Sequence, residues 1–281
     1  MTLFSSFFSA VFPSDRLIQN GSTATLIAAI IAYLSYKVKF LTGGGAVATF
    51  ILALLIFGLG GFKWALPILT FFILSSILSK MRKKKNSDVE LYFEKSGRRD
   101  QFQVLANGGI GGVLVILNSV DPQRIYYLLF LSSLASACAD TWATEIGTWK
   151  KTATYNILNR KPVAQGTSGG ISIPGTSGAL LGSITIAISG IGWSEIPYIQ
   201  FMILILSAGM AGSVIDSILG ATIQSQNRCG TCGKITERKI HCGIESVHFK
   251  GSKWINNDAV NLISGLAGVL LILFLNSIFK I

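Results

Sequence analysis

Charged residues are scarce in this sequence, and that scarcity excludes most classes of water-soluble protein. Only 13% of the 281 residues are Asp, Glu, Lys or Arg, whereas about 25% is usual in soluble domains. Half of the residues are hydrophobic, and the mean hydropathy is +0.56. The composition therefore excludes an ordinary cytosolic enzyme, a disordered tail protein and a DNA-binding module on a soluble core, and it indicates a polytopic membrane protein.

Cysteine and histidine are also rare, with four and two copies. Four cysteines in such a chain do not make a disulfide framework. The net charge of +11 does not indicate nucleic acid as a partner, because the basic residues lie between apolar runs, where membrane topology requires them. The apolar N-terminal stretch 1–16 lacks the basic start and the cleavage site of a signal peptide, so we expect it to be an interfacial segment.

The apolar runs have the length of transmembrane helices. A helical crossing needs roughly 17 to 25 apolar residues and a barrel strand about half as many, so a barrel is excluded. We predict an all-α membrane bundle of about eight helices in a single integral membrane domain, 1–281. The fourth and sixth spans start at glycines and are candidates for broken or re-entrant helices. The predicted spans are 20–36, 43–60, 64–80, 102–119, 124–146, 170–191, 197–222 and 258–279.

The distribution of Lys and Arg gives an independent test of this topology. Basic residues next to spans are retained on the cytoplasmic side. With eight spans and the N-terminus outside, 20 of the 24 basic residues fall on one face. Most of them lie in three loops, about 81–101, 147–169 and 223–257, which we predict to be cytoplasmic. Polar residues inside the spans lie near the same face, so the sequence predicts a polar site on one side of the membrane.

A first polar cluster surrounds the start of the fourth span. Arg98 and Arg99 stand at its mouth beside Asp100, and Gln103 and Asn107 share one helical face, one turn apart. One interpretation is an arginine fork for phosphate, because the guanidinium group matches phosphate geometry. The alternative is a stop-transfer charge cluster with a polar stripe that packs helices.

A second cluster places two acids near the end of the fifth span. A carboxylate inside a span costs a few kcal/mol on insertion scales, so such acids suggest function. Asp140 and Thr144 share one helical face and Thr141 and Glu145 the adjacent one, which offers four oxygen-bearing side chains to a hard cation such as Mg²⁺. The alternative is an Asp paired with Lys or Arg of a neighbouring helix.

A glycine-rich segment precedes the sixth span. Glycines and small hydroxyls at a helix start expose N–H groups where the helix dipole is positive, and such a place binds phosphate. The segment follows Lys161 and consists of Gln165, Gly166, Thr167, Ser168, Gly169 and Gly170.

Another acid, Asp216, lies late in the seventh span. The surrounding segment 213–222 is similar to 136–141 around Asp140, which suggests an internal repeat. Asn257, Asp258 and Asn261 form a polar entrance to the last span.

Three of the four cysteines occur close together in the loop 223–257. Cys229 and Cys232, followed by His241 and Cys242, have the short pair spacing of a zinc knuckle. Reduced thiols in a cytoplasmic hairpin explain the same pattern, so the sequence leaves a zinc site open without requiring it.

Five segments in order resemble the integral membrane family known as DUF92, or transmembrane protein 19-like. They are 97–109, 139–147, 165–172, 213–222 and 257–264. The resemblance spans nearly the whole chain, and plant and cyanobacterial members of that family include phytyl-phosphate kinase of tocopherol synthesis. The chain also has a more distant resemblance to CTP-using phytol kinases, dolichol kinases and CDP-diacylglycerol synthases. The shared arrangement is an intramembrane Asp with a following Gly, then a basic residue, a Pro and a Gly/Ser-rich segment.

The resemblance implies roles for particular residues. Asp140 matches the metal-associated acid of the distant relatives, and 161–170 matches their nucleotide-phosphate segment. Glu145, Arg98 and Arg99 belong to the motifs of the closer family.

Residues and resemblance together predict an enzyme that transfers a phosphoryl group from a nucleoside triphosphate, CTP by resemblance, to a prenyl monophosphate. In this hypothesis Asp140, with Glu145 or Asp216, holds Mg²⁺, and Lys161 and 165–170 hold the nucleotide. The arginine pair holds the prenyl phosphate, whose chain lies between spans.

A carrier or flippase for anionic lipids or metabolites is the main alternative, since glycine-interrupted spans with intramembrane acids also occur in transporters. The expected location is the plasma, thylakoid or plastid membrane, with the site on the cytoplasmic or stromal face. The sequence leaves open whether the chain forms a homo-oligomer.

Overall fold

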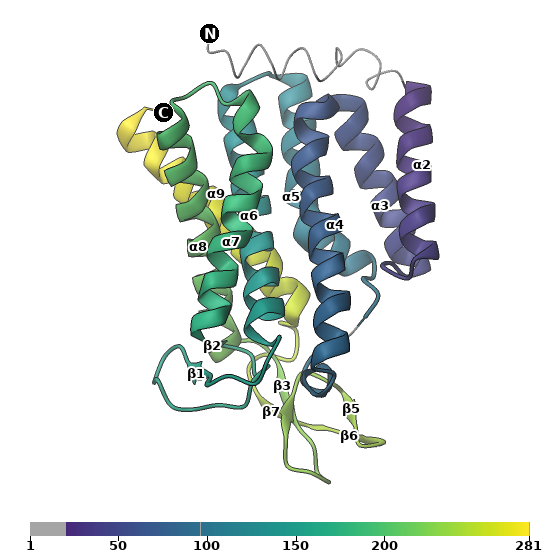
Figure 1. Ribbon diagram of the computed structural model, residues 1–281, viewed down its shortest axis with the longest axis vertical. Helices are drawn as coiled ribbons and strands as arrows, with labels where there is room; N and C mark the ends of the chain where they lie inside the picture. Colours follow the sequence, from purple (N-terminus) through teal and green to yellow (C-terminus); the bar gives the residue numbers. More distant parts are fainter. Residues whose placement is uncertain (1–20, 96, 281) are drawn as a thin grey trace.

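The structure is a computed structural model that describes residues 21–95 and 97–280. The N-terminal segment expected to be interfacial lies outside the described residues. The described chain is mostly helical, as predicted (Figure 1). The long helices are α2 (Gly21–Lys37), α3 (Gly43–Leu55), α4 (Gly61–Lys85), α5 (Gln101–Val120), α6 (Arg124–Gly147), α7 (Ile173–Gly190), α8 (Tyr198–Thr222) and α9 (Asn257–Phe279).

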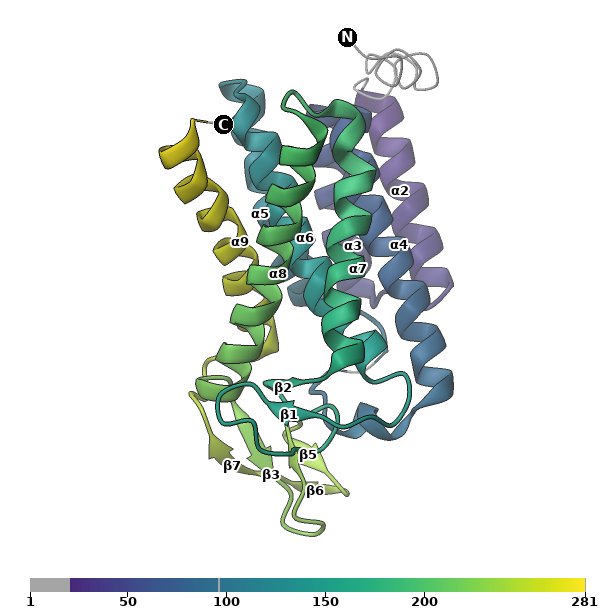
Figure 2. The same cartoon turned by 60° about the vertical axis from the view of Figure 1, so that its left-hand side comes forward.

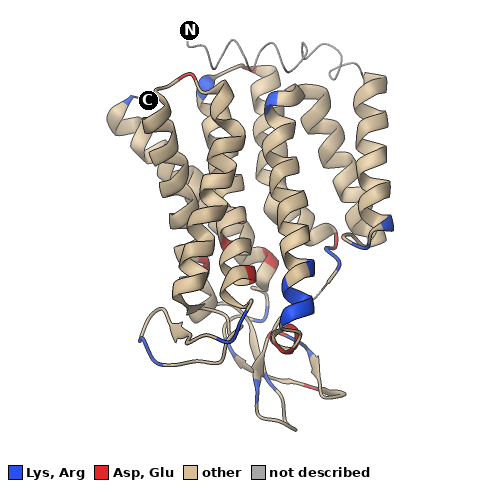
Figure 3. Cartoon of the chain, in the orientation of Figure 1, with Lys and Arg blue, Asp and Glu red and all other residues tan. Residues whose placement is uncertain are grey.

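The helices run up and down alternately, so the long connections gather at one end of the bundle, which we call the polar end (Figures 1 and 2). The polar end holds 86–100, 148–172 and 223–256, whereas the opposite end has only short connections. Most of the Lys and Arg residues lie at the polar end (Figure 3). This arrangement is the one-sided distribution that the charge pattern predicts.

The apolar length of the helices gives a separate count of candidate spans. Five helical stretches of the described residues are long and apolar enough to cross a membrane by length and composition. The count of eight spans is therefore not confirmed. The five stretches are Gly43–Lys85, Gln101–Val120, Ile173–Trp193, Tyr198–Thr222 and Asn257–Phe279.

The fourth and sixth predicted spans were expected to be broken or re-entrant at their glycines. This expectation is wrong, because α5 and α7 are continuous helices. Gly108 and Gly112 lie against Leu52 of α3, where an added Cβ would come within 2.6 and 2.8 Å of that side chain. These glycines allow close packing of helices. The irregular backbone instead separates α3 from α4, at the π-helical turn Ile56–Gly60 and at Gly61, whose φ is 67°.

Helix α6 lies at the centre of the bundle and packs against α4, α5, α7, α8 and α9. Phe130, Leu131 and Leu134 are fully buried in the apolar core, together with Ile186 of α7 and Phe201 of α8. Because other helices surround α6, its polar residues face protein. That position lets α6 carry an acid into the interior of the bundle.

Short strands in the loops at the polar end are an addition to the all-α prediction (Figure 2). They form three small antiparallel sheets. β1 (Tyr155–Asn156) pairs with β2 (Gly170–Ile171), β3 (Gln226–Arg228) lies between β4 (Ile235–Thr236) and β7 (Val247–Lys250), and β5 (Ile240–His241) pairs with β6 (Ile244–Glu245).

Candidate functional site

A cavity of about 580 Å³ opens at the polar end of the bundle. Its wall comes from the ends of α4, α5, α6, α8 and α9, from the start of α7 and from the three long connections. Eighteen of the residues singled out from the sequence line this one cavity. They are Arg98, Arg99, Gln103, Asn107, Asp140, Thr141, Thr144, Glu145, Gln165, Gly166, Thr167, Ser168, Gly169, Gly170, Asp216, Asn257, Asp258 and Asn261.

The carboxyl groups of Asp140 on α6 and Asp216 on α8 line the same cavity and interact with each other. One turn earlier, the same two helices touch at Ser136 and Gly212, where a Cβ on the glycine would overlap the serine side chain. The Ser136 hydroxyl also donates to the Ala208 carbonyl of α8, 3.1 Å away. This close crossing brings the two acids together.

The Asp140–Asp216 pair has a donor set that fits a hard divalent cation. Within the described part of the chain, neither residue forms an ion pair, and Oδ2 of Asp216 has no hydrogen-bond partner. Two adjacent carboxylates repel each other unless a proton or a cation lies between them. Because Mg²⁺ takes one or two carboxylates together with phosphate oxygens and water, the pair could hold this ion.

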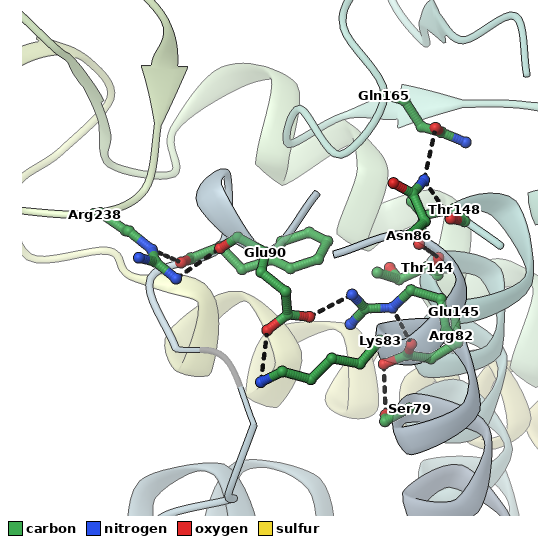
Figure 4. A network of polar contacts seen from close by, with 11 residues as sticks. Ser79, Arg82, Lys83, Asn86, Glu90, Thr144, Glu145, Thr148, Gln165 and Arg238 are labelled. Atoms are coloured by element: carbon green, nitrogen blue, oxygen red, sulfur yellow. Dashed lines mark hydrogen bonds and ion pairs between the residues drawn. The ribbon is translucent and has the colours of Figure 1, made fainter. Parts of the chain in front are cut away.

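Glu145 has a different environment (Figure 4). Its Oε2 accepts a hydrogen bond from Nε of Arg82 at 2.7 Å, and its Oε1 accepts one from the Ser79 hydroxyl at 2.5 Å. Arg82 also forms an ion pair with Glu90, and the three charged side chains are nearly completely buried. Since both Glu145 oxygens are engaged, the structure assigns this residue to a network that joins α4 to α6, and we do not retain it as a metal ligand.

Gln165 was expected to contact phosphate, but in the structure its side chain anchors the loop that follows α6. Its amide nitrogen donates to the carbonyls of Gly147 and Lys150, at 2.8 and 2.7 Å. The amide of Asn86 donates to the Thr148 carbonyl and to Oε1 of Gln165, at 2.9 and 3.4 Å (Figure 4). These bonds fix the loop after α6 against the end of α4.

The glycine-rich segment is a turn and does not begin a helix, which corrects the sequence interpretation. Gly166 and Gly169 have φ values of 88° and 79°, which favour glycine. Gly169 packs against Ala221 of α8, where an added Cβ would come within 2.5 Å. Helix α7 starts later, at Ile173, and the hydroxyl of Ser172 caps it. The segment therefore contacts the cavity through a tight turn.

Two predicted residues do not line the cavity. Lys161 is exposed in the connection between β1 and β2, so its position does not support a role at the nucleotide. Asp100 caps α5: its Oδ1 accepts from the Gln103 backbone N–H at 3.0 Å, and Oε1 of Gln103 accepts from the Asp100 N–H at 3.2 Å. The amide of Asn107 donates to the Gln103 carbonyl. Asp100 therefore orients the helix whose side chains reach the cavity.

Lys95 connects the start of α5 to the start of α9. Its ammonium group lies 2.7 Å from Oδ2 of Asp100 and also forms an ion pair with Asp258. The side chain of Asn256 caps α9 by accepting from the Ala259 N–H. Asp258 is therefore paired with a cation and contributes to the cavity wall.

Arg99 lies where two cavities meet. Its guanidinium group stands 5.5 and 5.9 Å from the ring centres of Phe71 and Phe72, and it forms no ion pair within the described residues. Burial lowers its pKa, so an anionic ligand would stabilise the charged form. Gln103 and Asn107 share this position, because all three residues line both the large cavity and a second one.

The second cavity measures about 60 Å³ and lies among α2, α3, α4 and α5. Its lining is mostly aliphatic and aromatic, with residues such as Ile31, Leu52, Phe57 and Leu69. A molecule with an anionic head at Arg99 could therefore place the start of an apolar chain between these helices.

Comparison with known proteins identifies the family. The integral membrane protein family DUF92 matches residues 26–269. The chain belongs to the DUF92 family. The resemblance predicted from the five motif segments is thus confirmed, and with it the assignment as an integral membrane protein.

Relatives of this DUF92 protein occur in plants and archaea. The chain is 32% identical to protein PGR of Arabidopsis thaliana, over 95% of this chain and 96% of the relative. It is 29% identical to an uncharacterized membrane protein of Methanocaldococcus jannaschii, over 86% and 89% of the two chains. It is 25% identical to protein VTE6, chloroplastic, of Arabidopsis thaliana, over 80% of this chain and 62% of the relative. No solved structure matches.

Glu237, another residue of the cavity wall in this DUF92 protein, did not stand out from the sequence. Its Oε1 accepts from the Ser168 hydroxyl at 2.7 Å and from the Gln224 amide at 2.8 Å, and its Oε2 accepts from the Glu94 N–H at 3.2 Å. Burial raises its pKa, an effect that these donors oppose. The signal available in the sequence was an acid inside a loop that is otherwise rich in Lys and Arg.

Proposed function

We propose that this protein is a Mg²⁺-dependent phosphotransferase that moves a phosphoryl group from a nucleoside triphosphate to a prenyl monophosphate. One observation carries the proposal: the Asp140–Asp216 pair faces the same cavity as Arg99, and Arg99 adjoins an apolar cavity. Phosphoryl transfer needs positioned reactants and cations that spread charge over the transferred group. A metal site beside a lipid-phosphate site supplies both.

The residues take the following roles. Asp140 and Asp216 would hold Mg²⁺, which when bound neutralises charge on the transferred phosphoryl group. Arg99, with the exposed Arg98 beside it, would bind the monophosphate, while the chain starts in the apolar cavity. The turn 166–170 lines the same cavity and would contact the nucleotide. A monophosphate is largely ionised at pH 7, since its second pKa is near 6, so the acceptor needs no general base.

Transport is less well supported than phosphoryl transfer. The acids inside the helices lie near the polar end, since Asp140 and Asp216 are both late in their helices and Asp258 is in the first turn of α9. Towards the opposite end, the centre of the bundle is filled by the apolar core around Phe130 and Phe201. This apolar core separates the acids from the opposite end of the bundle, which favours an enzyme at the interface over a carrier.

The substrate class follows from the family. The resemblance of the five segments to DUF92 members implies phytyl phosphate as the acceptor, and the more distant likeness to CTP-using lipid kinases implies CTP as the donor. We adopt both as part of the proposal, with the site on the cytoplasmic or stromal face.

The proposal is tested by incubating the purified protein in detergent with phytyl phosphate, Mg²⁺ and each nucleoside triphosphate in turn. We expect phytyl diphosphate, detected by mass spectrometry, and none from the Asp140→Asn variant. Absence of diphosphate with every nucleotide, together with movement of phytyl phosphate across proteoliposomes, would replace the kinase by a carrier.

A further inference from the structure

Cys229, Cys232, His241 and Cys242 come together below the polar end of the bundle, outside the proposed catalytic cavity. One ligand atom from each lies within 4.8 Å of all the others. Cys229 and Cys232 belong to the turn between β3 and β4, whereas His241 and Cys242 come from the β5–β6 hairpin. Two separate hairpins thus direct three thiols and one imidazole to a single point.

The distances match a tetrahedral metal site. Nδ1 of His241 lies 3.5 Å from Sγ of Cys232 and 3.2 Å from Sγ of Cys242. With Zn–S bonds of about 2.3 Å and Zn–N bonds of about 2.0 Å, a tetrahedron separates a thiolate from an imidazole nitrogen by roughly 3.5 Å. His241 is 5% exposed, and its Nε2 has no hydrogen-bond partner. A buried imidazole whose other nitrogen faces two thiols has the arrangement of a metal ligand.

The four residues lie in or beside two tight turns. The N–H of Gly233 donates to the Cys229 carbonyl, and the N–H of Cys229 donates to the Lys234 carbonyl, both at 3.0 Å. Gly233 and Gly243 have positive φ values, and so does Cys242, at 53°. A non-glycine residue held there indicates that its surroundings determine the conformation.

We propose that Cys229, Cys232, His241 and Cys242 bind one structural Zn²⁺ ion. Three thiolates and one imidazole favour zinc among the common divalent metals, and a closed four-ligand set without an open position is structural and not catalytic.

The metal would also affect the cavity, because it would join the two ends of the segment 233–240, at Cys232 and at His241. That segment carries Glu237, whose N–H donates to the Tyr92 carbonyl at 2.8 Å. The Thr236 hydroxyl donates to the Leu91 carbonyl at 2.7 Å, and Nε of Arg238 donates to the Phe93 carbonyl at 3.0 Å. Zinc would therefore hold the strand-like contact between 235–238 and 90–94 that delivers the Glu237 carboxylate to the cavity wall.

The test measures metal and does not depend on the kinase reaction. The full-length protein is purified in detergent with reductant, without chelator, from cells supplied with zinc, and its metal content is measured by mass spectrometry. We expect about one zinc ion per chain, and background levels in Cys232→Ser and Cys242→Ser. Cys138→Ala is the matched control, since this buried cysteine lies in the bundle core, and it should retain full zinc content.

A second measurement keeps the test decisive if the serine variants do not fold. Wild-type protein exchanged with Co²⁺ should show the visible absorption of tetrahedral cobalt with thiolate ligands. Removal of zinc by a chelator should expose Arg228 and Lys234 to faster cleavage by trypsin. Wild-type protein without zinc, or a disulfide between Cys229 and Cys232 in protein alkylated at lysis, would overturn the proposal.

Discussion

Asp140 and Asp216 meet because Ser136 packs on Gly212 one turn earlier along the same two helices. Each acid thus lies at a fixed offset from a contact between small residues, in α6 and in α8. The two segments that are similar in sequence, around Asp140 and around Asp216, are therefore the ones that pack against each other.

Replacing either acid by its amide should abolish activity. Asp140→Asn and Asp216→Asn keep the shape of the side chain but remove the charge that holds Mg²⁺, so we expect a fall in kcat of about 100-fold or more. Both variants should stay folded in detergent, because removing one of two adjacent carboxylates relieves repulsion. Turnover is measured with phytyl phosphate and CTP, and folding by thermal denaturation. Normal turnover in either variant would contradict the metal assignment.

The close crossing of α6 and α8 can be tested at Gly212. Gly212→Ala places a methyl group into Ser136, so we expect a lower Tm and reduced activity. Gly109→Ala is the control, because nothing lies within 4 Å of that position. Adding Ser136→Gly to Gly212→Ala should restore part of both properties. An unchanged single variant would show that the helices have room to spare.

Arg99 should determine affinity for the lipid phosphate. Arg99→Gln removes the charged donor, and a lost charged hydrogen bond costs about 1.5–3 kcal/mol, so KM for the prenyl monophosphate should rise about tenfold or more. The KM for the nucleotide should change much less. Lys151→Ala, which removes an exposed positive charge away from the cavity, is the control. Equal effects on both substrates would instead indicate a general loss of the site.

Glu145 should matter for stability more than for chemistry. Glu145→Gln breaks its buried ion pair with Arg82, and removing one partner of such a pair typically costs about 3–5 kcal/mol. Glu195→Gln removes an acid that pairs with Arg124 at an exposed position, where the expected cost is about 0–1 kcal/mol. Thermal denaturation in detergent compares the two. Loss of activity in Glu145→Gln with unchanged stability would return Glu145 to the metal site.

The ionisation of Glu90 should make the stability of the protein depend on pH in the acidic range. Burial alone would raise its pKa, but Arg82 and Lys83 outweigh that effect and hold the pKa below the ordinary value of 4.5. The stability that it contributes is therefore complete above about pH 4.5 and is lost as the pH falls through the lowered pKa. We expect the Tm difference between wild type and Glu90→Gln to shrink over that acidic range. A constant difference would show that the charge of Glu90 contributes nothing.

Local patterns predicted much of the site, because charged residues are costly in an apolar chain and therefore stand out. Asp140, Asp216 and Arg99 were identified in this way, and all three line one cavity. Arg82 was counted only as a topology signal, and Glu237 was hidden in a basic loop. Their importance depends on partners far away in the chain, which no local pattern specifies.

The sequence by itself determined the helical membrane class, the side of the bundle that carries the loops and the family. These properties follow from apolar length, from the position of basic residues and from motifs, all of which are local. The tertiary structure decided which acids are neutralised and which remain available. Glu145 and Asp140 are five residues apart on one helix, yet one meets Arg82 of α4 and the other meets Asp216 of α8. The difference arises because a helix presents successive residues to different neighbours, and only packing selects those neighbours.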